Sequence, residues 1–284
     1  MMRCCRKKKK HLLVDDSRKK RHRGLKLAVC AALLCLFCAA VSVYLLRERG
    51  ILFDNAPPLN RYPCRGAYVT EKTGKINWGL FNEKYIDFVY IRSTAGAAYV
   101  DSRFYDNKKS CSSCGLPVGF VHDLDPKTDG REQALAYLRA VGSLDGKLLP
   151  ILDIRRSFIE KITGVDARTI SVKAKDFSDC IYSSFGCKTV LMLDKDTYDI
   201  LKDRMNNFFI AVYGKNNDTA EFGWQLLAYG NNGRSSGIED SRCRYISLCA
   251  GKDVKAEDFL QMFTVKRKNI LNFTKIFPES SLFL

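Results

Sequence analysis

The sequence predicts an α/β fold: a TIM-like barrel of eight strands, the last three without intervening helices, plus one N-terminal transmembrane helix. Two observations support this prediction. Eight short, continuous apolar runs occupy residues 66–251, and polar, helix-like segments separate the earlier ones; an uncharged stretch, 27–46, precedes them all. Continuous apolar runs are typical of strands buried on both faces, and eight of them favour a closed barrel.

The N-terminal part of the chain predicts a membrane anchor. Residues 1–26 form a basic head, and residues 27–46 carry no charge. A helix of that length matches the ~30 Å bilayer core at ~1.5 Å per residue, and it exceeds the ~7–15 apolar residues of a cleaved signal peptide. We therefore expect a single-pass signal anchor, with the head in the cytoplasm and the barrel domain outside it. Residues 47–63, which contain adjacent prolines, are expected to form a linker or stalk.

The formal net charge of +16 is distributed unevenly. Residues 1–49 hold 14 Lys and Arg against 3 acids, which leaves 33 against 28 for the rest of the chain. Because the body carries little excess positive charge, nucleic acid is not an expected partner.

Cysteine and histidine usage argues against a metal centre. Seven of the twelve cysteines follow residue 63, and an odd number cannot all pair within one chain. Cys111 and Cys114 have no second C-x-x-C pair at zinc-site spacing, so they predict a local disulfide or two free thiols. Two of the three histidines lie in the basic head. We expect no metal and no cofactor.

The apolar runs define the expected strands, and the gaps between them define the connections. Helices are expected at 130–141, 166–185 and 194–205. After the sixth run the gaps shrink to 7 and 14 residues, against the ~10–12 that a crossover with its helix needs, so loops are expected there. The runs are 66–69, 88–94, 117–124, 148–154, 189–193, 208–214, 222–230 and 245–251.

These segments carry a family resemblance. In order along the chain, RGAYVTEKTGKINW, IDFVYIRSTAG, CGLPVGFVHDLDP, LPILDI, FFIAVYG and GWQ resemble the motifs of glycoside hydrolase family 25, the Chalaropsis-type lysozymes or muramidases. The resemblance runs from about residue 65 to about residue 250, and it implies a barrel domain at 64–251 that acts on or binds peptidoglycan. Residues 252–284 carry an amphipathic helical pattern and an apolar end, and we expect them to form a C-terminal helical tail that packs under the barrel.

The sequence departs from the family motifs where acids are expected. The Asp of the first motif falls on Tyr68, the Glu of the I-R-A-T-E-G motif falls on Ala95, and a late Asp falls near Cys243, with Arg242 and Arg244 as alternatives. The L-D-x-E motif keeps its Asp as Asp153 and has Arg155 in place of the presumed catalytic acid.

Asp153 and Arg155 face the same side of a strand, since they are two residues apart. A guanidinium lowers the pKa of a neighbouring acid, by ~1–3 units, whereas a glycosidase acid must hold its proton near neutral pH. Arginine cannot supply the proton. Asp153 is the catalytic candidate that the resemblance leaves, but we expect an ion pair at this strand end and impaired hydrolysis.

The resemblance also implies a set of substrate-binding residues, and several have plain structural alternatives. Two interpretations are open for Tyr213 and Trp224: they stack on a sugar ring, or they fill the barrel core. Two are also open for His122: it binds a sugar, or it makes structural hydrogen bonds. Asp123 and Asp125 form a substitute acid–base pair or cap a loop. The implied residues are Tyr68, Arg92, His122, Asp123, Arg155, Tyr213, Trp224 and Gln225.

Three functions stay open from the sequence. The first is a membrane-tethered, lysozyme-like pseudoenzyme that binds peptidoglycan or a related cell-wall glycan without efficient cleavage. The second is an active, divergent N-acetylmuramidase in cell-wall catabolism. The third is a protein-binding barrel with a vestigial pocket. Fold alone does not choose between them, because function belongs to the site.

Overall fold

The computed structural model describes residues 3–48, 56–81, 86–154, 166–204, 208–214, 223–240 and 242–266. The chain divides into two compact units, 1–54 and 55–284. The described part of the first unit is one long helix, α1 (Arg3–Glu48). Its segment Gly24–Leu46 is long and apolar enough to cross a membrane. A signal sequence near an N-terminus has the same length and composition. This helix is therefore a candidate for either a membrane span or a signal sequence.

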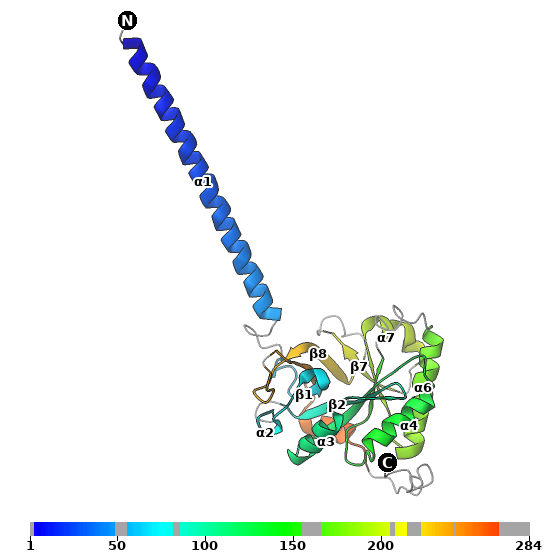
Figure 1. The fold of residues 1–284 in the computed structure, drawn as a ribbon. Helices are drawn as coiled ribbons and strands as arrows, with labels where there is room; N and C mark the ends of the chain where they lie inside the picture. Colours follow the sequence, from blue (N-terminus) through cyan, green and yellow to red (C-terminus); the bar gives the residue numbers. More distant parts are fainter. Residues whose placement is uncertain are drawn as a thin grey trace. The chain divides into compact units, whose positions relative to one another are not determined.

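The second unit is built on a closed barrel of eight strands (Figure 1), as predicted. Each of the eight apolar runs overlaps one strand of the barrel. Around the barrel the order is β1-β9-β8-β7-β6-β5-β4-β2, and a β1–β2 pairing closes it. The strands are β1 (Arg65–Val69), β2 (Phe88–Ala95), β4 (Val118–Asp123), β5 (Ile151–Ile154), β6 (Val190–Leu193), β7 (Phe209–Tyr213), β8 (Leu226–Gly233) and β9 (Tyr245–Ala250).

Strand direction defines the two ends of the barrel. Among the eight barrel strands, every neighbouring pair is parallel except those of β9, which runs antiparallel to both β8 and β1. The carboxyl ends of the parallel strands therefore share one end, which we call the mouth. No helix occurs in the described residues between β7 and β9, in agreement with the prediction that loops join the last strands.

The predicted helices form between the earlier strands, and their end residues explain their limits. Helix α4 (Gly130–Val141) begins after Asp129, whose carboxylate accepts from two backbone N–H groups, and it ends at Gly142 with φ 69°. Helix α6 (Ala167–Phe185) is capped in the same way by Asp166 and Gly186. The connections between the earlier strands also contain shorter elements: α2 (Trp78–Phe81), α3 (Phe104–Ser113), α7 (Lys195–Leu201), and the 3₁₀ turns η1 (Glu71–Thr73) and η2 (Lys202–Arg204).

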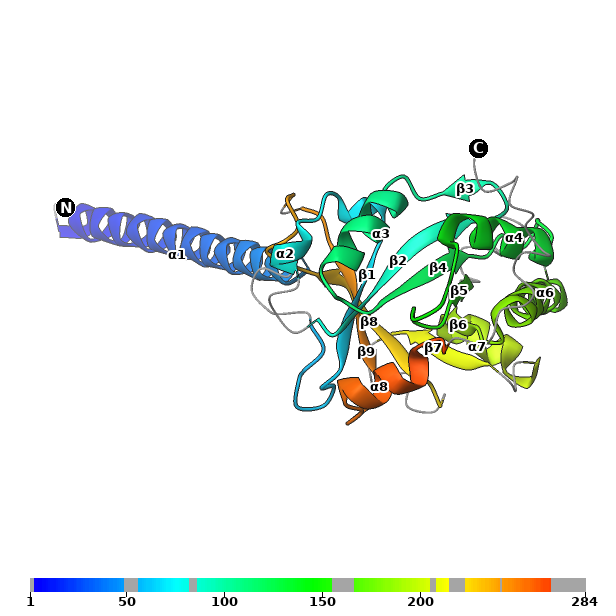
Figure 2. The same cartoon turned by 90° about the horizontal axis from the view of Figure 1, so that it is seen from below.

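The end opposite the mouth is covered by α8 (Ala256–Phe263), which lies beside β7 and β9 in Figure 2. Phe259 stacks on Phe88 at 4.5 Å between ring centroids, and Phe263 stacks on Phe209 at 5.6 Å. These partners start their strands, so α8 buries its aromatic face against the amino-terminal ends of β2 and β7. The described part of the C-terminal tail thus packs under the barrel.

One small element was not predicted. Strand β3 (Tyr99–Val100) folds back on the end of β2, with Ala95 opposite Tyr99. Two residues are too short for a pattern of alternation or continuous burial. Because β3 pairs with the end of β2, it places Tyr99 at the mouth.

Candidate active site

Two carboxylates lie side by side at the mouth. Asp123 ends β4, Asp153 lies near the end of β5, and the two residues are register partners on these parallel strands. Register partners on neighbouring strands lie about 4.8 Å apart and project to the same face. Asp153 is 3% exposed and Asp123 is half-buried. The structure therefore brings a second acid next to the one that the family motif retains.

Each carboxylate is contacted by a tyrosine from another strand. The hydroxyl of Tyr213, at the end of β7, donates a hydrogen bond of 2.7 Å to Oδ2 of Asp153. The hydroxyl of Tyr68, on β1, donates to Oδ1 of Asp123 at 3.5 Å. Both tyrosines were predicted at the site from the resemblance, and the structure places both beside acids. The two contacts join β1 to β4 and β7 to β5, so they connect strands that are far apart in the sequence.

Arg92 supplies the positive charge beside Asp123. Its Nε lies 3.0 Å from Oδ2 of Asp123, and its Nη1 lies 4.0 Å from Oε1 of Glu71. The guanidinium carbon is 5.1 Å from the centre of the Tyr99 ring, within reach of a cation–π interaction. Burial is the largest single influence and opposes the charged form of Arg92, but Asp123, together with Tyr68, Tyr99 and Asp101, outweighs it and raises the pKa of Arg92.

Glu71 and Tyr99 are site residues that the sequence reasoning missed. Hydrogen bonds, first from Tyr99 and then from Ser102, lower the pKa of Glu71, and the same contact raises the pKa of Tyr99 to about 12. Glu71 is therefore held as an anion near neutral pH. Its position two residues after the end of β1 was a usable signal, since residues that follow a barrel strand lie at the mouth. Tyr99 had no such signal.

His122 does not face the mouth. Its side chain is fully buried, and its ring stacks on Phe177 of α6 at 4.9 Å. Nδ1 lies 2.7 Å from Oγ1 of Thr94, and Nε2 lies 3.1 Å from Oε1 of Gln133 on α4. Burial lowers the pKa of His122 to about 4, so the ring is neutral near pH 7. The structure thus favours the structural role for His122 over contact with a sugar.

Trp224 and Gln225 are not brought to the mouth either. They precede β8, and Gln225 is tied to the start of β7: its N–H donates to Ile210 O at 2.9 Å, and its Oε1 accepts from Ile210 N at 2.7 Å. Trp224 packs on Tyr62, which lies just before β1. Both residues therefore lie at the amino-terminal end of the parallel strands. The structure therefore does not bring them next to the two carboxylates, whereas the GWQ motif suggested a substrate-binding role for them.

Arg155 lies outside the described residues, which stop at 154 and resume at 166. The predicted pairing of Arg155 with Asp153 stays a prediction. In the described part of the chain, no three His, Cys, Asp or Glu side chains are grouped so that they could hold a metal ion.

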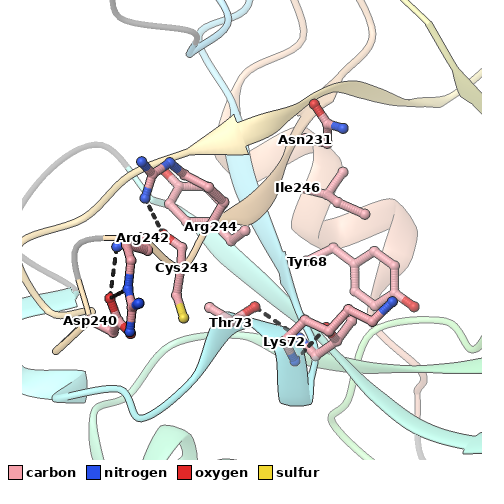
Figure 3. Close-up of a pocket in the computed structure, with 11 residues that line it drawn as sticks. Tyr68, Lys72, Thr73, Asn231, Asp240, Arg242, Cys243, Arg244 and Ile246 are labelled. Carbon is pink, nitrogen blue, oxygen red and sulfur yellow. Dashed lines mark hydrogen bonds and ion pairs between the residues drawn. The ribbon is translucent and has the colours of Figure 1, made fainter. Parts of the chain in front are cut away.

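A pocket of about 580 Å³ lies between β1, η1 and the segment from the end of β8 to the start of β9 (Figure 3). Tyr68 belongs both to this pocket and to the surroundings of Asp123, because it lines the pocket and its hydroxyl reaches Asp123. Cys243, where the resemblance places a late Asp, also lines the pocket. The full lining is Tyr68, Thr70, Lys72, Thr73, Asn231, Asp240, Arg242, Cys243, Arg244, Tyr245 and Ile246.

A barrel with acids at the carboxyl ends of its strands has the layout of a barrel enzyme. Residues 69–238 match the family described as Glycosyl hydrolases family 25. The chain therefore belongs to glycosyl hydrolase family 25, as the motifs indicated.

Curated relatives of this chain are lysozymes. It is 23% identical over 184 residues to the autolytic lysozyme of Clostridium acetobutylicum, covering 62% of this chain and 53% of that protein. It is 29% identical over 104 residues to lysozyme M1 of Streptomyces globisporus, covering 35% of each. The chain thus matches about half of the first relative and a third of the second.

Solved structures agree on the fold. A family 25 glycosyl hydrolase from Bacillus anthracis superposes with a TM-score of 0.61 at 21% identity, covering 70% of this chain and 93% of that one. A muramidase from Trichobolus zukalii gives 0.59 at 18% identity, covering 69% and 98%. At these identities the likeness shows the barrel, and the function has to be argued from the site.

Proposed function

We propose that this chain is a membrane-anchored, lysozyme-like protein whose barrel mouth binds peptidoglycan or a related cell-wall glycan, and whose hydrolysis is impaired. Family membership and the lysozyme relatives support the glycan as the ligand class. The tyrosine-rich rim of the mouth also suits a sugar ring, because an aromatic side chain offers an apolar face and a polar edge.

The pairing of the acids at the mouth carries the impaired-hydrolysis part of the proposal. Glycoside hydrolysis needs one carboxylic acid that protonates the leaving oxygen. Asp123 forms an ion pair with Arg92, and Asp153 accepts a hydrogen bond from Tyr213 while almost fully buried. The ion pair with Arg92 favours the charged form of Asp123, which is the form that cannot donate a proton. The sequence adds Arg155 two residues beyond Asp153, where the family motif has an acid.

The anchoring part rests on α1 and on charge. Helix α1 contains the apolar segment Gly24–Leu46, and the basic residues cluster before it. Lys and Arg are retained on the cytoplasmic side of a membrane span, so this distribution favours a cytoplasmic N-terminus and an extracytoplasmic barrel.

Retention on purified sacculi tests the binding. We expect the full-length chain, solubilised in detergent, to sediment with sacculi, and we expect Arg92→Met to sediment less because its loss disturbs Asp123 and Tyr99 together. Lys175→Met, which removes an exposed cation on α6, is the matched control and should sediment like the wild type. Wild-type protein that stays in the supernatant would exclude this function.

A second candidate, an active divergent muramidase, is favoured by one observation. Asp123 and Asp153 are in register on neighbouring strands, and paired carboxyl groups of glycosidases lie about 5–10 Å apart. In this reading Asp123 replaces the acid missing at 155. Release of new reducing ends from peptidoglycan, lost in Asp153→Asn, would establish it.

A further inference from the structure

A row of register partners crosses the mouth from β3 to β5. Tyr99 on β3 lies opposite Ala95 at the end of β2, and Ala95 in turn lies opposite Asp123 on β4. The pairing of Asp123 with Asp153 continues the row. Register partners project to the same face of a sheet, and neighbouring strands are about 4.8 Å apart. The side chain of Tyr99 therefore projects to the same face as the two carboxylates, two strands away from Asp123.

Arg92 connects the ring of Tyr99 to the carboxylate of Asp123. Its guanidinium carbon lies 5.1 Å from the centre of the ring, and its Nε lies 3.0 Å from Oδ2 of Asp123. Ala95, which stands between them in the row, contributes only a methyl group where the family motif has Glu. A ligand that lies against the two carboxylates is therefore within one side-chain length of the Tyr99 ring.

The ring of Tyr99 is fixed at its polar edge. Its hydroxyl donates a hydrogen bond to the carboxylate of Glu71, which also accepts from Oγ of Ser102 at 2.9 Å. The backbone N–H of Glu71 donates to Oδ2 of Asp101 at 3.0 Å, so the turn after β3 is tied to η1. A side chain that is already held in place loses little further conformational freedom when a ligand binds, and this favours affinity.

One face of the Tyr99 ring is accessible. Arg92 lies over the ring, yet Tyr99 is 39% exposed, so its accessible surface is the opposite face and an edge. Tyr68, by contrast, is buried, and its ring offers no such face. The pyranose rings of β-1,4-linked glycans have flat faces of axial C–H groups, and an aromatic side chain presents a matching apolar face while its hydroxyl stays at a polar edge.

We propose that Tyr99 is a sugar-stacking residue of the mouth, and that its accessible face receives the C–H face of a β-linked pyranose. The inference rests on the proposed function and deepens it, because it specifies which residue contacts the glycan and which surface of the sugar is recognised. The sugar on Tyr99 lies next to Arg92, and the adjoining part of the glycan extends along the row toward Asp123 and Asp153.

Binding of the N-acetylglucosamine hexasaccharide, a soluble β-1,4-linked glycan, tests the role of Tyr99. Its dissociation constants are measured by calorimetry for the detergent-solubilised full-length chain and its variants. Tyr99→Ala should bind roughly three- to tenfold more weakly, the effect of losing one aromatic stacking contact, whereas Tyr99→Phe should bind like the wild type because it keeps the ring. Tyr182→Ala is the matched control: this exposed tyrosine lies near the end of α6 that leads into β6, opposite the mouth, and its loss should leave the affinity unchanged.

Magnetic resonance gives a second readout that does not depend on the alanine variant. When only the tyrosine rings carry isotope label, nuclear Overhauser contacts from a labelled ring to sugar protons should appear in the wild type. A set of these contacts should vanish in Tyr99→Phe, which keeps both the ring and the fold. A tyrosine that only supported the hairpin would give no contact to the sugar.

The outcomes separate this inference from the proposed function. Equal affinity of the wild type and a folded Tyr99→Ala, or no loss of any sugar contact in Tyr99→Phe, overturns the role of Tyr99 and leaves glycan binding intact. If the hexasaccharide does not bind, retention on sacculi decides: Tyr99→Ala should be retained less than Tyr182→Ala, and equal retention overturns the inference. Wild-type protein that binds neither ligand overturns the proposed function as well.

Discussion

At the residue scale, the balance of charge at the mouth depends on Arg92. Its guanidinium lies against Asp123, and Asp123 in turn lies beside the buried Asp153. Two neighbouring carboxylates repel each other unless a cation or a hydrogen-bond donor compensates them. The arrangement of Arg92, Tyr68 and Tyr213 around the pair provides this compensation, so these side chains stabilise the mouth.

Arg92→Met should lower the free energy of unfolding by roughly 1–3 kcal/mol, because Asp123 then keeps its charge without its cation. Asp123→Asn in the same chain should recover part of this loss. Chemical denaturation of the wild type, both single variants and the double variant gives the coupling energy, which we expect to reach about 1 kcal/mol. Strictly additive effects would show that Arg92 and Asp123 do not interact.

His122 predicts a pH dependence of stability. Its pKa is lowered from 6.5 to about 4 in the folded chain, so the unfolded chain takes up the proton first as the pH falls. The free energy of unfolding should therefore decrease between pH 6.5 and 4, by about 3 kcal/mol from this group. Above pH 6.5 its contribution is constant.

The measurement for His122 is a series of denaturation curves between pH 7 and pH 4. His122→Gln keeps polar contacts to Thr94 and Gln133 but does not titrate, so its stability should fall less steeply than that of the wild type. Equal slopes in the two proteins would mean that His122 takes up its proton at the same pH in the folded and the unfolded chain.

At the element scale, close contacts inside the barrel depend on glycine. A Cβ on Gly119 of β4 would lie 2.3 Å from the ring of Tyr90 and 2.9 Å from the Cβ of Leu148. Tyr90 is fully buried and its hydroxyl donates to Leu149 O, so the ring cannot move aside freely. Strands β2, β4 and β5 approach each other at this point, and they carry Arg92, Asp123 and Asp153.

Gly119→Ala should therefore destabilise the barrel, by about 1–3 kcal/mol for an overpacked core. Gly230→Ala on β8 is the matched control, because a Cβ there meets no atom within 4 Å. Thermal denaturation of the two variants compares them directly. A Gly119→Ala protein that melts with the wild type would refute the close contact.

The sequence predicted the elements better than it predicted the site. The strands were readable because they are buried on both faces, and α4 and α6 because Asp and Gly mark their ends. Trp224 and Gln225 were expected at the substrate site from the GWQ motif. The apolar run 222–230 begins four residues before β8 starts at Leu226, and a continuous apolar run does not show where strand pairing begins. The contact of Tyr213 with Asp153 joins residues 60 apart, which no local pattern reveals.

At the scale of the whole molecule, the chain consists of a helix with a candidate membrane span and a barrel whose function we place at its mouth. An anchored barrel would act only on glycan within reach of the membrane, whereas a released barrel would diffuse. The state of residues 27–46 therefore decides where the protein works.

Alkaline extraction of membranes tests the anchor. We expect the full-length chain to remain in the membrane pellet, and Leu33→Arg with Leu36→Arg to shift it to the supernatant, since each arginine costs about 2.5–3.5 kcal/mol at the centre of a span. Leu59→Arg, at an exposed position outside the span, should leave the chain in the pellet. A shorter, soluble chain detected by mass spectrometry would contradict anchoring and indicate a cleaved signal.

Our central claim is that the mouth binds glycan but does not hydrolyse it, because Asp123 is paired with Arg92 and Asp153 is bonded to Tyr213. Reducing-end release from purified peptidoglycan tests this claim most directly. The full-length chain, in detergent and at a concentration at which it sediments with sacculi, should release reducing ends at the same background rate as Asp153→Asn. Release well above that background, abolished by Asp153→Asn or Asp123→Asn in a folded protein, would contradict the claim and make this chain an active muramidase.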